Sequence, residues 1–461
     1  MNLSFAALQA DQAALAVTSN NVANQNTVGY TREVVNWQAS DVVSLGKAQI
    51  NGATLGAGPI SQRDRVLEQR VQQQTQAQTQ SATIESGFQE LQNIFGLSST
   101  ATSSSTTVLG AATDSFFSSL TSLASSPADS ATRQKVLSAA NVLASAFNSA
   151  SAQLAQVSSN LDGQVSSIVT QVNSLSATIA ALNGAISSLG AGKDAGTLED
   201  ERQAAIAKLS QYVGLDQVST EQNSITLTTS GGSVLVGGKA SYPLSASQIS
   251  GTTHVFDGAT GQDITGKLTG GQLGGVLIVR DQELPQVSKA LDTLAYGVAS
   301  QVNLQNALGI DGSGSPGNAI FGLGSGPSGA AGSIIVSATS SLSIAAAVSG
   351  QGSSSNGNAQ ALADLATANI AGGTTASSFY ASLLSQVGSN AAQATADNTV
   401  QQVTLTQLTT QRDSLSGVSL NQEAANLTQY QRSYEAAAKV FAIVDSIMAS
   451  ALNLGQQTTV A

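Results

Sequence analysis

The sequence of 461 residues contains no cysteine, one histidine, one tryptophan and two methionines. Without cysteine the chain can form neither disulfides nor thiolate metal sites, and it has no thiol nucleophile. Its single histidine, His254, cannot build the usual histidine-rich zinc site. Charged residues make up 10% of the chain, against about 25% in typical soluble domains. These absences argue against an enzyme that depends on a metal or a thiol.

The balance of charge excludes further classes of partner. The formal net charge is −11 and basic residues are not clustered, so we expect no nucleic-acid partner. No basic residue precedes Arg32, which predicts that the chain has no cleavable secretory signal peptide. The longest aliphatic run, VLIV at 276–279, is far shorter than the ~20 residues that span a bilayer. We therefore expect no membrane insertion.

Two glycine-rich stretches, GSGSPG at 312–317 and GSGPSG at 324–329, have the glycine spacing of a dinucleotide-binding fingerprint. That spacing binds a pyrophosphate only where it joins a strand to the N-terminus of a helix. Here Pro316 and Pro327 interrupt the pattern, and no amphipathic helix follows. We interpret both stretches as flexible loops and predict no cofactor.

The remaining polar residues do not form a catalytic constellation. His254 lies in a stretch rich in glycine and threonine, and the chain has no GxSxG elbow, which favours a surface or half-buried structural histidine. Asp257 and Asp263 lack the alternating acidic ladder of a calcium loop. We predict no catalytic, cofactor-binding or metal site. Ordinary helix-surface or domain-boundary charges are expected at Arg202, Arg280, Asp281 and Glu283.

Both ends of the chain carry narrow apolar rows at heptad spacing, as packed helices do. The N-terminal row consists of Leu8, Leu15 and Val22. The C-terminal seam, rich in alanine and free of proline and glycine, consists of Leu420, Leu427, Tyr430, Tyr434, Phe441, Val444 and Met448. One interpretation is a helical hairpin buried within a globular domain. The other is an assembly surface, in which the two rows pair with each other and with neighbouring copies.

The N-terminal helix is followed by SNNVANQNTVGYTR, residues 19–32, with asparagine at four positions. Asparagine prefers caps and turns to helix interiors. We expect this segment to end the N-terminal rod, with Gly29 permitting the backbone turn and Tyr30 anchoring it. The assembly residues predicted in this turn are Asn24, Asn26, Thr27, Gly29 and Tyr30.

Between the two ends, apolar periodicity predicts a long helix over 133–190, with β-branched residues and leucine in alternate heptad positions. Shorter helices are expected at 60–95, 198–213, 281–308 and 376–415. Residues 216–270 alternate instead with period two, and their paired glycines at 231–232 and 237–238 suit hairpins.

The order of these signals predicts a protein that is mainly α with β insertions, built as nested domains. Residues 1–40 and 417–461 form a terminal coiled-coil rod, and residues 41–215, 271–310 and 367–416 form a helical-bundle body. A β-rich insertion covers 216–270, and a Gly/Ser-rich extension of loops and strands, the outer domain, covers 311–366.

The segment SNNVANQNTVGYTR resembles the signature of bacterial flagellar rod, hook and hook-associated proteins, in which an asparagine-rich turn ends the terminal helix. Further blocks are similar to the hook-associated proteins at the first junction between hook and filament. These blocks are PADSATRQKVLSAANVLASAFN (127–148), LEDERQAAIAKLSQYVGL (198–215), QLGGVLIVRDQELPQVSKALDTLAYGVASQVN (272–303) and GVSLNQEAANLTQYQRSYEAAAKVFAIVDSIMASALNL (417–454). Together they cover both ends and most of the helical body.

The resemblance implies a structural role in the flagellum. Such proteins leave the cell unfolded through the flagellar type III export apparatus, without a cleavable signal peptide, and work outside the cell. They self-associate into a short helical ring, with the terminal helices as its inner tube. The implied partners are the hook protein, the second hook–filament junction protein and a cytoplasmic export chaperone that binds the C-terminal helix. The ring would provide the platform on which the next junction protein and flagellin assemble.

Two other functions compete with this interpretation. A hook or distal-rod protein would share the N-terminal signature, but we would not expect it to carry the 272–303 block. A secreted adhesin or enzyme could use the same export route, but an enzyme would need a catalytic constellation in the insertion.

Overall fold

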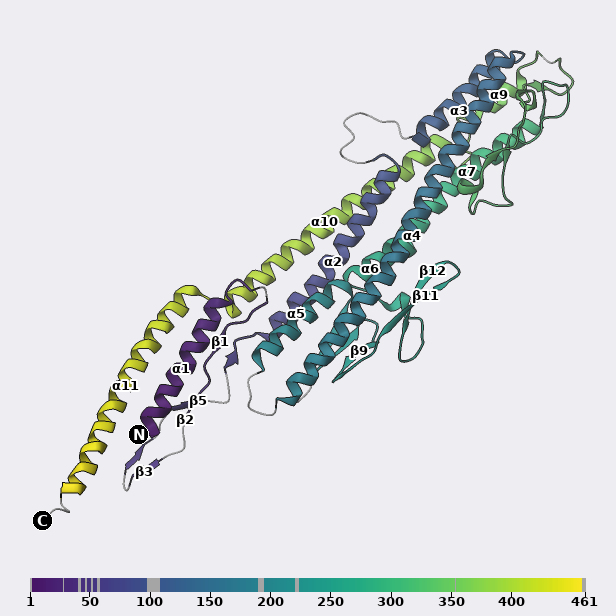
Figure 1. The fold of residues 1–461 in the computed structure, drawn as a ribbon. Coiled ribbons are helices and arrows are strands. Elements are labelled where there is room, and N and C mark those ends of the chain that lie inside the picture. The colour runs from purple at the N-terminus through teal and green to yellow at the C-terminus, as the bar shows by residue number, and fades with distance from the viewer. Residues whose placement is uncertain are drawn as a thin grey trace.

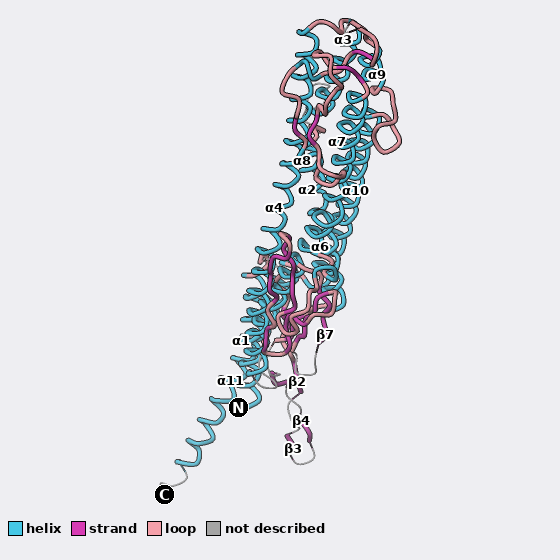
Figure 2. Tube along the Cα trace, turned by 90° about the vertical axis from the view of Figure 1, so that its right-hand side faces the viewer, coloured by secondary structure: helices cyan, strands magenta, loops and turns pink. Residues whose placement is uncertain are grey.

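The chain forms an elongated molecule in which both termini lie at one end (Figure 1). The computed structural model describes residues 2–27, 29–39, 43–45, 48–50, 53–55, 59–97, 108–189, 195–219, 224–352 and 354–457. The extreme positions of the predicted rod, Met1, Ser40 and 458–461, lie outside these ranges. Long helices dominate, and short strands lie beside them (Figure 2). The predicted fold class, mainly α with β insertions, is confirmed, whereas the predicted division into folding units remains a prediction.

Two of the long helices begin where an aspartate can cap them. The carboxylate of Asp129 accepts from the backbone N–H of Ala131, and that of Asp64 accepts from Val66 and Leu67, all at 3.0 Å. The predicted helices at 133–190, 198–213 and 376–415 are confirmed, whereas the helix predicted at 60–95 begins only at Arg65, because residues 60–61 form a strand. The principal helices are α1 (Asn2–Ala23), α2 (Arg65–Ile94), α3 (Val108–Ser125), α4 (Ser130–Ser188), α5 (Gly196–Tyr212), α7 (Leu284–Ala307), α10 (Ala376–Ser416) and α11 (Leu420–Gln457).

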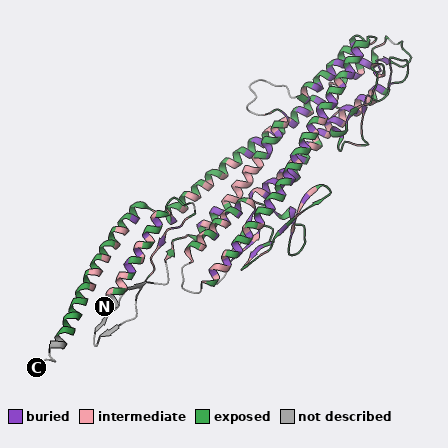
Figure 3. Cartoon of the chain, viewed as in Figure 1, coloured by how far each residue is buried: buried purple, intermediate pink, exposed green. Residues whose placement is uncertain are grey.

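The core follows α4, whose heptad rows face α3, α5, α7 and the strands. Leu161, Val165, Ile168, Val172 and Ile179 are each at most 4% exposed. By length and composition alone, α4 is long and apolar enough to cross a membrane, but these rows contribute to the protein core. Among the described residues, the core extends from Phe88 to Ala394 and includes no residue of α1 or α11. The body is therefore packed independently of the two terminal helices (Figure 3).

The helix predicted at 281–308 begins earlier than expected and changes geometry on the way. Helix α6 (Gly271–Ile278) runs into one π-helical segment, Val279–Glu283, and then into α7. Glycines allow α6 to lie close to α2, because a Cβ on Gly275 would come within 2.6 Å of Thr83 Cβ. A Cβ on Gly87 would likewise meet Val279 Cγ2 at 2.6 Å.

The β-rich insertion lies beside α4, halfway along the molecule (Figure 1). Its antiparallel sheet has the order β10-β9-β8-β7, and a separate hairpin joins β11 to β12. Gly232 and Gly238 have φ of +88° and +59° in the turns between these strands, which confirms the predicted hairpins. The strands are β7 (Leu215–Ser219), β8 (Ile225–Thr229), β9 (Val234–Gly237), β10 (Ala240–Ser241), β11 (Leu244–Ile249) and β12 (Thr252–Asp257).

The Gly/Ser-rich extension packs at the end of the molecule opposite the termini (Figure 1). Two asparagines of α7 hold its loops in place. Asn306, fully buried, donates to Asn318 O (2.7 Å) and Ser343 O (3.1 Å) and accepts from the N–H of Ala345 (2.8 Å). Asn303 makes similar bonds to the backbone of 320–321. The elements here are β13 (Gly309–Ile310), β14 (Phe321–Gly322), α8 (Ala330–Ser333), β15 (Ile335–Val336), β16 (Ala347–Val348) and α9 (Gly357–Asp364).

Short strands also lie beside the terminal helices, in a region where the sequence patterns predicted none. They pair as antiparallel ribbons, β1 with β6, β2 with β5 and β3 with β4. Their bounds are β1 (Glu33–Val34), β2 (Trp37–Ala39), β3 (Val43–Leu45), β4 (Ala48–Ile50), β5 (Ala53–Leu55) and β6 (Ile60–Ser61).

Candidate assembly site at the paired chain ends

The first and last helices of the chain, α1 and α11, lie side by side (Figures 1 and 2). The most buried residues of α1 are small or polar, namely Ala10, Ala14, Thr18 and Asn21, each at most 3% exposed. Small side chains at spacings of three and four allow a neighbouring backbone to approach closely. The interface is therefore centred on this stripe of α1.

The predicted rows flank that stripe and are only partly buried. Leu8, Leu15 and Val22 are half-buried on α1. On α11 the half-buried members of the predicted seam are Leu427, Tyr430, Tyr434, Phe441 and Val444. Leu420 and Met448, at the two ends of the seam, are 49% and 46% exposed. The structure thus brings the middle of the seam against α1 and leaves its ends open.

Two contacts tie the aromatic residues of α11 to the N-terminal part of the chain. The amide of Gln12 donates to the hydroxyl of Tyr434 at 3.4 Å. The ring of Trp37, in β2, lies 6.3 Å from that of Tyr430 in a tilted arrangement. Both contacts join residues from opposite ends of the sequence, so the chain ends form one structural unit.

The asparagine-rich segment forms the turn that ends α1. The side chain of Asn24 donates to Asn20 O (3.1 Å) and Asn20 Oδ1 (2.8 Å), and its backbone carbonyl accepts from the N–H of Thr27 (2.9 Å). Gly29 has φ of +85°, a conformation that side chains other than glycine rarely adopt. Asn26 is exposed. The turn therefore depends on Asn24 and Gly29 in the way its composition predicts.

Asn21 is the centre of this turn, although it was not among the predicted assembly residues. Its side chain is buried and donates to Glu33 O (2.8 Å) and Glu423 Oε2 (3.3 Å). Its Oδ1 accepts from the N–H of Glu33 (3.0 Å) and from the hydroxyl of Tyr30 (2.9 Å). One amide thereby connects α1, the extended segment after it and the first turn of α11.

An ion pair completes this connection. Arg32 Nε lies 2.6 Å from Glu423 Oε1, and the two side chains are 11% and 1% exposed. Arg32 also donates its backbone N–H to Ser416 O (2.9 Å) and a guanidinium N–H to Gln62 (2.9 Å). Removing either partner would destabilise the fold, because the other charge would remain buried and unpaired. We call Asn21, Tyr30, Arg32 and Glu423 the terminal clamp.

Most residues of the terminal clamp are polar or charged, so apolar heptad spacing does not identify them. A usable signal was present in the charge pattern. Arg32 is the first basic residue of the chain, and Glu423 is the acidic residue in the first turn of α11. In a chain with so few charges, such isolated ions mark positions where a specific partner is required.

Two arginines predicted as ordinary surface or boundary charges are buried, so that prediction was wrong for them. Arg202 is 2% exposed and donates to Asn183 Oδ1 at 2.9 Å. Arg280 is 4% exposed and binds Asp162 Oδ1 (2.9 Å), Thr253 O (2.7 Å) and the adjacent Asp281 (2.7 Å). Sequence spacing could not show this, because Asn183, Asp162 and Thr253 come from other elements. Arg280 thereby fastens the β11–β12 hairpin to α4.

The polar residues of the β insertion serve its turns. His254 Nδ1 lies 2.7 Å from Asp263 Oδ2 on the half-exposed face of β12. Asp263 accepts from Thr265, which holds the pKa of its carboxyl below the ordinary value. Asp257 accepts from the backbone N–H groups of Thr260 and Ala259, and these bonds also lower its pKa. Each acidic group therefore has a structural role in a turn.

Helix α11 carries a second apolar face that α1 does not cover. Val440, Ile443 and Ile447 are 51%, 59% and 62% exposed and stand three and four residues apart. Leu452, farther along the helix, is 73% exposed. We call Val440, Ile443 and Ile447 the outer row of α11. Exposed apolar side chains at this density are typical of surfaces that other chains cover.

Family comparisons match both ends and the body of the chain. A model described as "Flagella basal body rod protein" matches residues 1–31, and one described as "Flagellar basal body rod FlgEFG protein C-terminal" matches 410–454. Residues 96–321 match "Flagellar hook-associated protein FlgK helical domain". The terminal matches coincide with α1 and α11, so the fold and its paired ends define a flagellar axial protein.

Relatives of known name resemble the chain over almost its whole length. Flagellar hook-associated protein 1 of Escherichia coli (strain K12) is 26% identical, over 98% of this chain and 99% of the relative. The protein of the same name from Bacillus subtilis (strain 168) is 28% identical, over 97% and 96%. The chain is thus similar to flagellar hook-associated protein 1 over nearly the full length of both proteins.

A solved structure has the same fold. The flagellar hook junction protein FlgK from Burkholderia pseudomallei aligns with a TM-score of 0.68 at 20% identity. The alignment covers 75% of this chain and 100% of the other. At this level of identity the likeness shows a shared fold.

Proposed function

We propose that the chain is a structural component of the bacterial flagellum that self-assembles as the junction between hook and filament. In this proposal many copies form a short ring, and α1 and α11 of each copy line its inner part. The observation that carries the proposal is the outer row of α11, which is apolar, exposed and outside the face that packs against α1.

The energetics of the outer row favour association. Burying an apolar side chain stabilises an interface by about 1.5–3 kcal/mol relative to leaving it in water. Val440, Ile443 and Ile447 gain little of this in the single chain, because they are more than half exposed. Each neighbouring copy that covers them adds the same gain, so a ring accumulates it over all its subunits.

The remaining elements of the proposal follow from the similarity to flagellar hook-associated protein 1. The chain would leave the cell through the flagellar export apparatus without a cleavable signal peptide, and a cytoplasmic chaperone would cover the C-terminal helix before export. Outside the cell, the ring would contact the hook protein below it and the second junction protein above it. We propose no catalytic role, no cofactor and no metal.

The outer row can be tested without disturbing the clamp. Ile443→Asp places a carboxylate on this row, where burial of an unpaired charge costs several kcal/mol. The single chain should fold normally because Ile443 is exposed, whereas the ring should fail. In cells that lack the native gene, we expect hooks without filaments and flagellin in the medium, measured by electron microscopy and immunoblotting.

A matched control is available on the same helix. Ala442 is exposed on α11 and stands neither three nor four residues from any member of the outer row, so Ala442→Asp adds the same charge on another side of the helix. This variant should restore filaments. Both variants must reach the medium at the level of the native protein. Normal filaments with exported Ile443→Asp would show that the outer row is not an assembly surface.

A further inference from the structure

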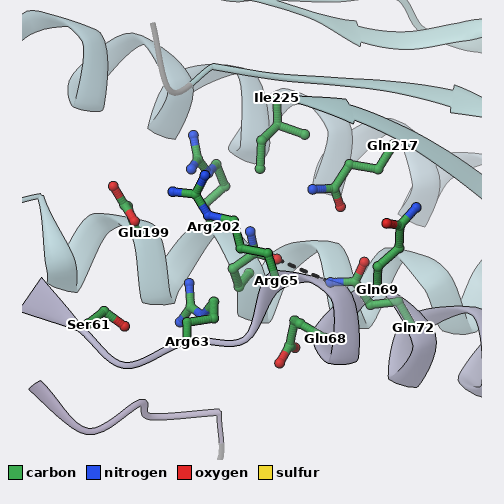
Figure 4. A pocket seen from close by; sticks show the side chains of 11 residues that line it. Ser61, Arg63, Arg65, Glu68, Gln69, Gln72, Glu199, Arg202, Gln217 and Ile225 are labelled. Carbon is green, nitrogen blue, oxygen red and sulfur yellow. Dashed lines mark hydrogen bonds between the residues drawn. The ribbon is translucent and has the colours of Figure 1, made fainter. Parts of the chain in front are cut away.

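Three arginines line one cavity at the start of α2. Arg63, Arg65 and Arg202 approach it from the segment before α2, from its first residue and from α5 (Figure 4). The cavity measures about 190 Å³, well above the ~15 Å³ that one water molecule needs. Of the charged residues in its lining, the three arginines outnumber two glutamates, Glu68 and Glu199.

The three guanidinium groups are close enough to affect one another. Burial is the main cause that lowers the pKa of Arg202, and the positive charges of Arg63 and Arg65 lower it further, while Glu199 acts in the opposite sense. Arginine clusters of this kind are unfavourable unless negative charge lies among them. The negative charge at this site comes from Glu68 and Glu199 in the lining and from Asp200, which pairs with Arg63.

One side of the cavity also carries hydrogen-bond donors that lack an acceptor among the described residues. Arg63 is 9% exposed at its side chain, and its Nη2 binds Asp200 and the hydroxyl of Thr31 (3.0 Å). Its Nε is buried and has no hydrogen-bond partner among the described residues, and the same holds for Ser61 Oγ. A buried donor without an acceptor costs about 1–3 kcal/mol. A ligand that accepts hydrogen bonds would remove this cost.

We propose that this cavity binds a small oxyanion, a carboxylate or a phosphate. Guanidinium groups present paired N–H donors in a planar fork, which matches the geometry of both anions. An anion here would accept from Arg65 and from Arg63 Nε and would lie beside Arg202. It would thereby join the start of α2 to α5.

The position of the cavity gives such binding a structural consequence. Residues 59–64 lead from the strands beside the terminal helices into α2, and Arg63 already contacts α5 through Asp200. An anion between Arg65 and Arg202 would add a second connection at the same joint. Binding would therefore stiffen the passage from the terminal helices to the body.

The proposal is tested on the full-length chain with inorganic phosphate and with acetate as separate probes. Ionic strength is kept constant with chloride, and binding is followed by isothermal titration calorimetry and by the melting temperature. We expect saturable binding of at least one probe with a rise in melting temperature. The comparison of phosphate with acetate shows whether the site prefers a free tetrahedral anion or the carboxylate that a protein side chain would supply.

A pair of variants separates this site from general charge effects. Arg65→Gln removes an exposed member of the cluster and should weaken binding about tenfold or more, the loss expected for one charge-assisted pair. Arg70→Gln removes the same charge from the same helix but outside the cavity, and should bind as the native chain does. Circular dichroism confirms that both variants fold.

The outcomes are distinct. Binding that is lost in Arg65→Gln and retained in Arg70→Gln supports the site. Binding that is equal in the two variants, or that appears with neither probe in the native chain, overturns it. The result does not depend on ring assembly, so the site can fail while the proposed junction role stands.

Discussion

Asn21 makes four hydrogen bonds from a buried position, and its partners all lie on segments outside α1. Asn21→Ala would leave the N–H and C=O of Glu33 and the carboxylate of Glu423 without this amide. At about 1 kcal/mol for each bond, we expect the opening free energy of the paired ends to fall by about 2–4 kcal/mol. Hydrogen exchange of the α1 amides in the isolated chain measures this.

Asn26 provides the control for that experiment, since it is an exposed asparagine in the same turn. Asn26→Ala should leave exchange in α1 within about 0.5 kcal/mol of the native value, as is usual for surface positions. Exchange in α4 should be unaffected by either change, because the core of the body includes no described residue of α1. Equal exchange in the two variants would show that Asn21 does not hold the clamp.

At the residue scale, the sequence predicted local backbone turns better than it predicted which side chains are buried. Gly29 and Asn24 could be placed in a turn because their preferences act locally. The burial of Arg202 and Arg280 could not be predicted, because it arises from Asn183, Asp162 and Thr253, which other elements supply. The charge of a residue does not show whether its side chain is buried.

At the scale of elements, the long helices were predictable and several short elements were not. Helix α4 was expected at 133–190 and spans Ser130–Ser188, because its heptad rows repeat over many turns. Helix α3 was missed although Leu109, Ala112, Phe116, Leu120 and Leu123 recur at spacings of three and four, so its sequence carried a usable helical signal. The two- and three-residue strands near the terminal helices are too short for alternation to identify them.

The close crossing of α2 and α6 depends on glycine, so a larger residue at this crossing should destabilise the chain. In Gly275→Ala the new Cβ would lie 2.6 Å from Thr83 Cβ and 2.8 Å from Gln80 O, so the helices must separate. Overpacking of this kind costs about 1–3 kcal/mol. We expect a lower melting temperature in thermal unfolding followed by circular dichroism.

The same substitution in a helix with free space should act in the opposite sense. Gly163 lies within α4, and a Cβ there would meet no heavy atom within 4 Å. Gly163→Ala should therefore stabilise the chain by about 0.5–1 kcal/mol through helix propensity. A higher melting temperature for Gly275→Ala than for Gly163→Ala would contradict the close crossing of α2 and α6.

At the scale of the whole molecule, the chain separates a self-sufficient body from ends that depend on each other. The core extends along α4 and, among the residues described, leaves out α1 and α11, whereas the terminal clamp and the half-buried seam connect the two ends and the segments beside them. The ends can therefore respond to assembly without disturbing the body. That arrangement suits the proposed role, in which a folded subunit joins a ring.

Phe441 tests whether pairing within one chain and assembly between chains are separate steps. Phe441 is half-buried on the face of α11 that packs against α1, while Ile443 is exposed on the outer row. In Phe441→Asp a carboxylate enters the seam, where burial disfavours its charged form. We expect faster hydrogen exchange in α1 of the isolated chain, little change in circular dichroism, and cells with hooks but no filaments. Ile443→Asp should abolish filaments while exchange in α1 stays native.

If Phe441→Asp, exported at normal levels, still supports filaments, pairing of α1 with α11 is not required for the junction. If both variants accelerate exchange in α1 equally, the two faces of α11 do not act separately, and the division of labour proposed for this helix is wrong.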